Sequence, residues 1–172
     1  MKSKIQATVI KNSGYDALQP IYDFNNLSGN EFKSREMYEQ LPSLYMNLID
    51  EEYLELQEAH DTEDFQGYLD SLADLIVVAA GGLYSVGIHP NEVLRVVNES
   101  NMSKFCTTEQ EAKDSVAAYK DDHRYEDVHY EYNKENNKYV IRGKKSGQDG
   151  WKILKSVNWQ EPDFSHLIGK GE

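Results

Sequence analysis

The chain has few residues of the kinds that mark secreted, membrane or nucleic-acid-binding proteins. Its 172 residues contain one cysteine, Cys106, which excludes an intrachain disulfide and fits a reducing compartment. The N-terminal residues MKSKIQATVIK lack the apolar core of a signal peptide, and the longest apolar run, near Leu75 to Leu83, is too short to span a bilayer. We therefore expect a soluble, cytoplasmic protein without a membrane partner.

Basic residues are scarce relative to acidic ones. Eighteen Lys and Arg stand against thirty Asp and Glu, which gives a formal net charge of −12 at pH 7 and a pI of about 4.8. Nonspecific nucleic-acid binding requires a basic surface, so this charge argues against nucleic acid as a partner. It does not argue against nucleotides, because divalent metal ions can bridge acidic side chains to phosphates.

Between Leu48 and Tyr84 there is no Lys or Arg, and two expected helices carry acidic residues among apolar ones. At 100° of rotation per residue, apolar side chains between Leu41 and Ala59 form one stripe on the first helix. Glu52 and Glu55 fall within this stripe, and Glu51 lies near its edge. Taken alone, such an acidic run is more often a solvated helix face.

The second helix, expected from about Asp64 to Val86, is apolar nearly all round and is therefore predicted to be buried. Asp70 and Asp74 lie in it one turn apart. Carboxylates in an apolar setting are costly unless they are paired or bind a metal, so these two favour a functional reading over a solvated face. If the two helices are antiparallel, their acids converge. Oxygen-only ligation favours Mg²⁺ or Mn²⁺ and suits phosphoryl or nucleotidyl chemistry.

The rest of the chain predicts a mainly α protein with a small C-terminal β region. Alternating aromatic and polar residues over 125–140 surround a Lys-Glu-Asn-Asn turn and predict a β-hairpin, while residues 4–10 suit a short strand or an ordered tail. We expect a single domain over residues 1–172, with a helical bundle at about 17–121 and a β appendage and tail at about 122–172. Capping and turn residues delimit the remaining helices, expected over 17–28, from about Ser43 to Ala59, from Pro90 to about Phe105, and from Thr107 to about Asp121.

Three segments resemble the MazG-like all-α nucleoside triphosphate pyrophosphohydrolases, and more narrowly their phage branch described as phosphoribosyl-ATP pyrophosphohydrolase-like. The segments are LIDEEYLELQEA, YLDSLADLIVVAAGGLYSVGI and VVNESNMSKF, and the ending GWKILKSVNWQEPDFS is also similar. The family motif is E-E-x-x-E followed by E-x-x-D. Here Ser71 takes the place of the last glutamate, and Asp70 beside it follows the phage pattern D-x-L-x-D. The resemblance covers most of residues 40–165.

This resemblance implies a four-helix-type bundle that forms homodimers or homotetramers and holds two or three Mg²⁺ or Mn²⁺ ions per site. It implies hydrolysis of a nucleoside triphosphate to the monophosphate and pyrophosphate by attack of water on the α-phosphorus. A purine substrate is favoured, with dGTP as the best choice, through similarity to MazZ-type enzymes.

The implied site residues fall into three groups. Glu51 and Glu52 are the expected catalytic acids, with Glu51 either a ligand or the acid that orients the attacking water. Phosphate or sugar contacts are expected from Asn101, Lys104 and Lys155, and a base edge is expected to meet Asn25 or Asn26. The expected metal ligands are Glu52, Glu55, Asp70 and Asp74.

Two other functions compete with this one. An acidic helical module that binds a basic partner would also carry such acids, but a non-catalytic relic would be expected to replace buried acids with apolar residues and gain stability. Cleavage of phosphoribosyl-ATP is the other alternative, and it differs in substrate rather than in the kind of site.

Overall fold

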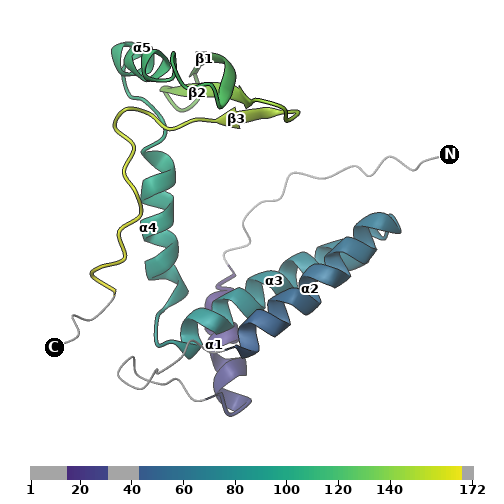
Figure 1. Ribbon diagram of the computed structural model, residues 1–172. Coiled ribbons are helices and arrows are strands. Elements are labelled where there is room, and N and C mark those ends of the chain that lie inside the picture. The colour runs from purple at the N-terminus through teal and green to yellow at the C-terminus, as the bar shows by residue number, and fades with distance from the viewer. Residues whose placement is uncertain (1–14, 31–42, 168–172) are drawn as a thin grey trace. The chain divides into compact units, whose positions relative to one another are not determined.

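The computed structural model of the protein describes residues 15–30 and 43–167, which form five helices and three strands. The expected strand or tail over residues 4–10 lies outside these ranges. The chain divides into two compact units, Met1–Pro90 and Asn91–Glu172 (Figure 1). Each unit is described by itself below.

The first unit is built on a helical hairpin of α2 (Leu44–Asp61) and α3 (Phe65–Ser85), with α1 (Leu18–Leu27) packed on α3 (Figure 1). The Asp64 side chain caps α3 by accepting a hydrogen bond from the Gln66 backbone N–H at 3.1 Å. Gly87 ends α3 in a left-handed conformation with φ of 72°. These boundaries confirm the predicted helices and caps.

The three helices meet at a glycine in α3. A Cβ added to Gly81 would lie 2.7 Å from Cε1 of the Tyr45 ring, so only glycine permits this approach between α2 and α3. The Tyr45 hydroxyl donates a hydrogen bond of 2.7 Å to Oδ1 of Asn25 in α1. Ile21, Ala80 and Tyr84 form the adjoining apolar cluster between α1 and α3. The helices α2 and α3 therefore pack closely at this glycine.

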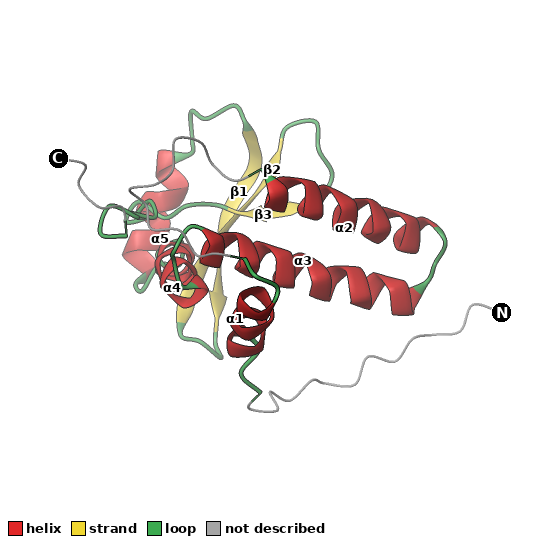
Figure 2. Cartoon of the chain, turned by 90° about the horizontal axis from the view of Figure 1, so that it is seen from below, coloured by secondary structure: helices red, strands yellow, loops and turns green. Residues whose placement is uncertain are grey.

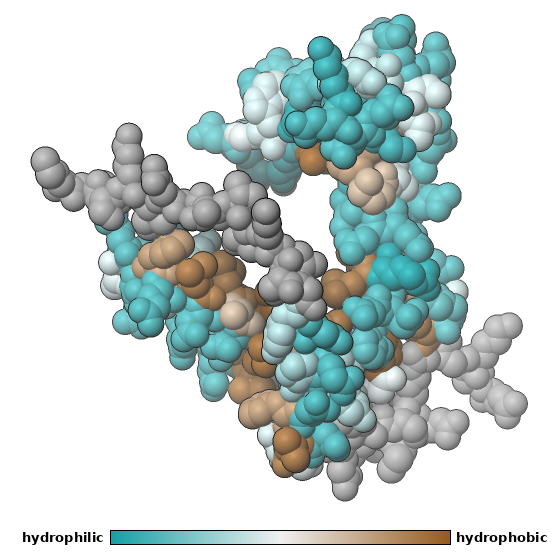
Figure 3. Space-filling model, turned by 180° about the vertical axis from the view of Figure 1, so that it is seen from behind, coloured by the Kyte–Doolittle hydropathy of each residue, from teal (hydrophilic) through white to brown (hydrophobic). Residues whose placement is uncertain are grey.

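The prediction that α3 is buried holds only in part. Its buried residues include Ser71, Ala80 and Gly81, but Leu72 is 37% exposed and Ile76 is 62% exposed. The helix is apolar nearly all round, whereas in this unit only α1 and α2 pack against it among the described helices. Figure 3 shows apolar side chains along the arm that α2 and α3 form. By length and composition alone α3 could also cross a membrane, a test that core helices of other proteins pass too.

The second unit contains most of α4 (Pro90–Met102), α5 (Glu109–Ala118) and an antiparallel sheet. The sheet has the order β1 (Tyr125–Asn133), β2 (Lys138–Lys145) and β3 (Trp151–Ile153) (Figure 2). The first two strands confirm the predicted hairpin, and β3 was not predicted. The core of this unit joins helix and sheet through Cys106, Ala112, Ile141 and Leu154.

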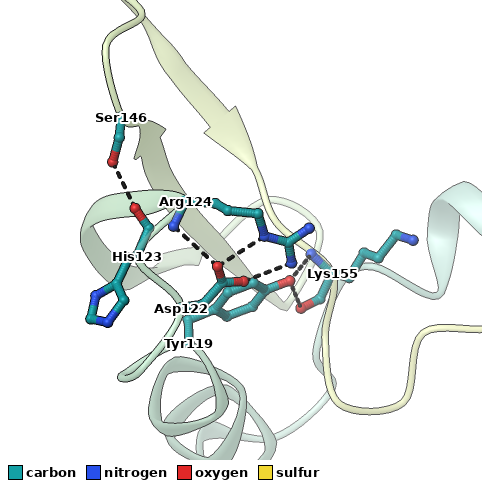
Figure 4. Close-up of polar contacts among 6 residues, drawn as sticks. All are labelled: Tyr119, Asp122, His123, Arg124, Ser146 and Lys155. Carbon is teal, nitrogen blue, oxygen red and sulfur yellow. Dashed lines mark hydrogen bonds and ion pairs between the residues drawn. The ribbon is translucent and has the colours of Figure 1, made fainter.

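The helix α5 packs on the sheet, which differs from the expected helical bundle over residues 17–121. A capping box starts it: the Thr108 hydroxyl accepts from the Glu111 N–H, and the Glu111 carboxylate accepts from the Thr108 N–H. After α5, the Tyr119 hydroxyl donates to the carbonyl of Lys155 and accepts from its N–H, which ties the segment after β3 to the turn after α5 (Figure 4). The apolar side of α5 thus packs against the strands and not against other helices of a bundle.

Candidate metal and nucleotide site

The acids singled out by the sequence lie on the facing helices of the first unit. Among them, Glu52 has a carboxylate whose pKa is raised, first by burial and then by the charges of the four others. The helical hairpin therefore places the four other acids within electrostatic range of Glu52. The five acids are Glu51, Glu52 and Glu55 from α2, and Asp70 and Asp74 from α3.

Glu52 is the acid with the least satisfied environment. Its Oε2 atom is buried and has no hydrogen-bond partner among the described residues. A buried acceptor left without a partner costs about 1–3 kcal/mol, and more when it is charged. No Lys or Arg occurs from residue 36 to residue 94, so neither helix offers a lysine or arginine to pair with it. A bound cation would satisfy this carboxylate.

The other acids are more open to solvent. Glu51, Glu55 and Asp70 are exposed, and Asp74 is half-buried. Within residues 15–30 and 43–167, no three His, Cys, Asp or Glu side chains are grouped closely enough to hold a metal ion. The chemistry of these side chains, which offer only carboxylate oxygens, nevertheless suits a hard divalent cation.

Asn25 has a structural role in this unit. It is 4% exposed, and its amide donates to the Ile21 carbonyl at 2.8 Å. Its Oδ1 accepts from the Tyr45 hydroxyl at 2.7 Å and from Asn30 at 3.0 Å. Asn26, the other candidate for a base contact, is exposed. Base recognition by either residue stays a prediction, but the Asn25 side chain also joins α1 to α2, a contact that the sequence did not reveal.

The three predicted phosphate or sugar contacts gather in the second unit. The Lys104 ammonium donates to Oδ1 of Asn101 at 2.8 Å. The Ser156 hydroxyl donates to the Ser103 carbonyl at 2.8 Å, so the chain segments that carry Lys104 and Lys155 lie next to each other. The Lys155 ammonium lies 3.2 Å from the centroid of the Trp159 ring. These serine contacts were not predicted, because an isolated serine gives no signal of its partner.

Comparison with known proteins agrees with the pattern in the sequence. Residues 29–101 match the family described as phosphoribosyl-ATP pyrophosphohydrolase, and this stretch holds all five acids and Asn101. An uncharacterized protein of Acanthamoeba polyphaga mimivirus is 41% identical over 85 residues, which are 48% of this chain and 32% of that relative. The chain thus spans about a third of the relative's length, and no solved structure matches it. Residues 29–101 are thus similar to the phosphoribosyl-ATP pyrophosphohydrolase family, which is consistent with a MazG-like nucleotide pyrophosphohydrolase.

Proposed function

We propose that the protein is a metal-dependent nucleoside triphosphate pyrophosphohydrolase that converts a (d)NTP and water to the (d)NMP and pyrophosphate. The observation that carries this proposal is the buried Oε2 of Glu52, which has no hydrogen-bond partner among the described residues and whose carboxylate feels the charges of four other acids. The family match over residues 29–101 supports a nucleotide pyrophosphohydrolase in general. The metal and the substrate are our inference.

In this proposal Glu52, Glu55, Asp70 and Asp74 hold two or three Mg²⁺ or Mn²⁺ ions. Such ions, when bound, neutralise phosphate charge and activate water. Glu51 is exposed at the edge of the acidic group, so it can accept a proton from the attacking water or orient it toward the α-phosphorus. Asp70, one position before Ser71, supplies the oxygen that the family's glutamate would supply.

Substrate selection would come from residues outside this acidic group. Asn101, Lys104 and Lys155 are proposed to contact the sugar or the phosphates, since a triphosphate carries more negative charge than the metal ions neutralise. Asn25 or Asn26 is proposed to meet the base. A purine, with dGTP as the best choice, follows from the similarity to MazZ-type enzymes.

We also propose that two copies complete a four-helix bundle, as a homodimer or as half of a homotetramer. The support is the exposed apolar side of α3, where Leu69 is 52% and Ile76 is 62% exposed. Pairing two such hairpins would bury these side chains and gain about 25 cal/mol for each Å² removed from water. Light scattering should give at least twice the chain mass for the protein, and less for Ile76→Asp. A monomeric wild type would contradict this arrangement.

A panel of nucleotides tests the reaction. Each (d)NTP is incubated with Mg²⁺, with Mn²⁺ or with a chelator, and pyrophosphate is measured. We expect metal-dependent release, lost in Glu52→Gln and kept in the matched control Glu58→Gln, an exposed acid on the same helix. If no nucleotide releases pyrophosphate with either metal, the proposal fails.

The same panel separates the alternatives. Phosphoribosyl-ATP is assayed beside dGTP, and preferential cleavage of phosphoribosyl-ATP would assign the site to that substrate. An acidic helical binding module would show no turnover at all and would bind basic peptides through the acids of α2. Release of pyrophosphate therefore excludes the binding module as the whole function.

A further inference from the structure

Two lysines of the second unit lie over tryptophan rings. The Lys144 ammonium lies 4.6 Å from the centroid of the Trp151 ring, and the Lys155 ammonium lies 3.2 Å from that of Trp159. The Lys144 ammonium also forms an ion pair of 2.7 Å with Asp127. In the part of the chain that the structure describes, Lys155 forms no ion pair with an acid. The charge of Lys144 is therefore compensated, whereas that of Lys155 is not.

The backbone of Lys155 is fixed by the residue that follows α5. The Tyr119 hydroxyl donates a hydrogen bond to the Lys155 carbonyl at 3.1 Å and accepts one from its N–H at 3.0 Å. Figure 4 shows the Lys155 side chain extending away from Tyr119. Lys155 is exposed, and an ammonium group has three N–H donors. Its ammonium can therefore contact the ring on one side and a ligand on the side that faces solvent.

A turn brings the Trp159 ring back to Lys155. The Trp159 N–H donates to the Ser156 carbonyl at 3.1 Å, which closes a four-residue turn directly after Lys155. The buried Ser156 hydroxyl donates to the Ser103 carbonyl at 2.8 Å. The Ser103 hydroxyl in turn accepts from the Gln160 N–H at 2.9 Å. Both ends of the turn are thus anchored to the residue that follows α4, and the ring is held at a fixed place beside the lysine.

The Trp159 ring acts on Lys155 through its face. The ring Nε1 atom is buried and has no hydrogen-bond partner among the described residues, so its polar group makes no contact that holds the lysine. The negative face of an indole attracts an ammonium group. This attraction restricts a long side chain that otherwise loses much rotamer freedom when it binds a ligand. A lysine held in this way binds an anion at a lower entropic cost.

We propose that Trp159 is a positioning residue, whose ring holds the Lys155 ammonium in place to bind a phosphate group of the nucleotide. The inference rests on the proposed function, in which Lys155 contacts the phosphates. An oxyanion is the ligand that fits, because the ammonium offers N–H donors and an uncompensated positive charge. Lys104, whose segment lies next to that of Lys155, forms its hydrogen bond of 2.8 Å with the amide oxygen of Asn101 rather than with an acid. It therefore adds a second ammonium to the same region.

The probe is inorganic tripolyphosphate, which carries the phosphates of the substrate without base or sugar. The full chain is titrated in a chelator at constant ionic strength, so that metal and turnover play no part, and the Lys155 side-chain signals are followed by NMR. We expect saturable binding that is about fivefold weaker in Trp159→Leu. Trp159→Phe keeps a ring and removes only the unpaired N–H, so it should bind nearly as the wild type does. The matched control is Trp151→Leu, which removes the other ring of this kind and should leave the affinity unchanged.

Thermal unfolding and turnover separate the outcomes. If Trp159→Leu lowers the melting temperature but binds tripolyphosphate like the wild type, the ring only stabilises the fold and the proposal is overturned. Absence of saturable binding by the wild type, or an equal loss in Trp151→Leu, would overturn it too. With a nucleotide that is hydrolysed, Trp159→Leu should raise KM more than it lowers kcat.

The two proposals fail in different ways. Binding of tripolyphosphate at Lys155 without hydrolysis of any nucleotide would refute the pyrophosphohydrolase reaction and keep the oxyanion site. Hydrolysis with the same KM in Trp159→Leu and the wild type would refute the role of Trp159 alone.

Discussion

Replacing Glu52 with glutamine should have opposite effects on stability without and with metal. In metal-free protein the carboxylate is partly buried, one of its oxygens has no hydrogen-bond partner within residues 15–30 and 43–167, and the charges of four other acids act on it. Glutamine keeps the shape and removes the charge. We therefore expect Glu52→Gln to be more stable than the wild type in a chelator and less stable than the wild type in saturating Mg²⁺ or Mn²⁺.

The size of each effect follows from the environment of Glu52. A buried acceptor without a partner costs about 1–3 kcal/mol, and more when it is charged, so neutralising it while an amide oxygen remains should recover about 1 kcal/mol. For a unit of this size, this raises the melting temperature by about 4–8 °C. Metal at about 100 times its dissociation constant stabilises the wild type by about 2.7 kcal/mol, an effect that Glu52→Gln should largely lose.

The pH dependence gives the same prediction an independent check. The pKa of Glu52 is raised in the folded protein above its ordinary value of 4.5, so folding favours the protonated form. Its contribution to the free energy of unfolding is therefore greatest at low pH and is lost as the pH rises through the folded pKa. The stability advantage of Glu52→Gln in the chelator should grow over that rise.

The measurement is thermal unfolding of the wild type, Glu52→Gln and Glu58→Gln, followed by far-ultraviolet circular dichroism with a chelator and with each metal. The exposed Glu58 serves as the control for removing one negative charge from α2. If Glu52→Gln is no more stable than Glu58→Gln in the chelator, burial and the neighbouring charges do not destabilise the Glu52 carboxylate. If metal stabilises the wild type and Glu52→Gln equally, Glu52 is not a ligand.

Three further predictions concern the scaffold. Gly81→Ala should destabilise the first unit by about 1–3 kcal/mol, because its new Cβ would lie 2.7 Å from a ring carbon of Tyr45; an unchanged melting temperature would show that α2 and α3 can separate freely. Thr108→Ala should cost about 1 kcal/mol by removing the cap of α5, measured by urea unfolding. The pKa of Glu111 is lowered by hydrogen bonds from the N–H and hydroxyl of Thr107, so its stabilising contribution is lost as the pH falls through the folded pKa. Glu111→Gln should therefore reduce the fall of the melting temperature at acidic pH. An unchanged fall would contradict these hydrogen bonds.

The sequence predicted the helices well where local signals fix their ends. The helix expected from about Ser43 matches α2, the one expected from about Asp64 to Val86 matches α3, and the one expected from Thr107 matches α5. These boundaries depend on residues within one turn of each helix end, so they can be read without knowledge of the fold. The short strand β3 has no such pattern, because three residues are too few to show alternation.

The site could be predicted only to the level of residue types. The spacing of the acids predicted that they converge, and in the structure the charges of the four other acids raise the pKa of Glu52, although no three acids of the described residues are grouped closely enough to hold a metal ion. The burial of α3 could not be predicted, because periodicity shows which side chains are apolar but not how many helices cover them. The contacts of Asn25 with Tyr45 join residues twenty positions apart, and no local pattern encodes that pairing.

The central claim is attack of water on the α-phosphorus of a nucleoside triphosphate at the Glu52 site. The most direct test is hydrolysis of dGTP with Mn²⁺ in water enriched in oxygen-18, followed by mass spectrometry of both products. We predict that the label appears in dGMP, that pyrophosphate is unlabelled, and that Glu52→Gln yields neither product. Label in the pyrophosphate, release of single phosphates, or full turnover by Glu52→Gln would contradict it.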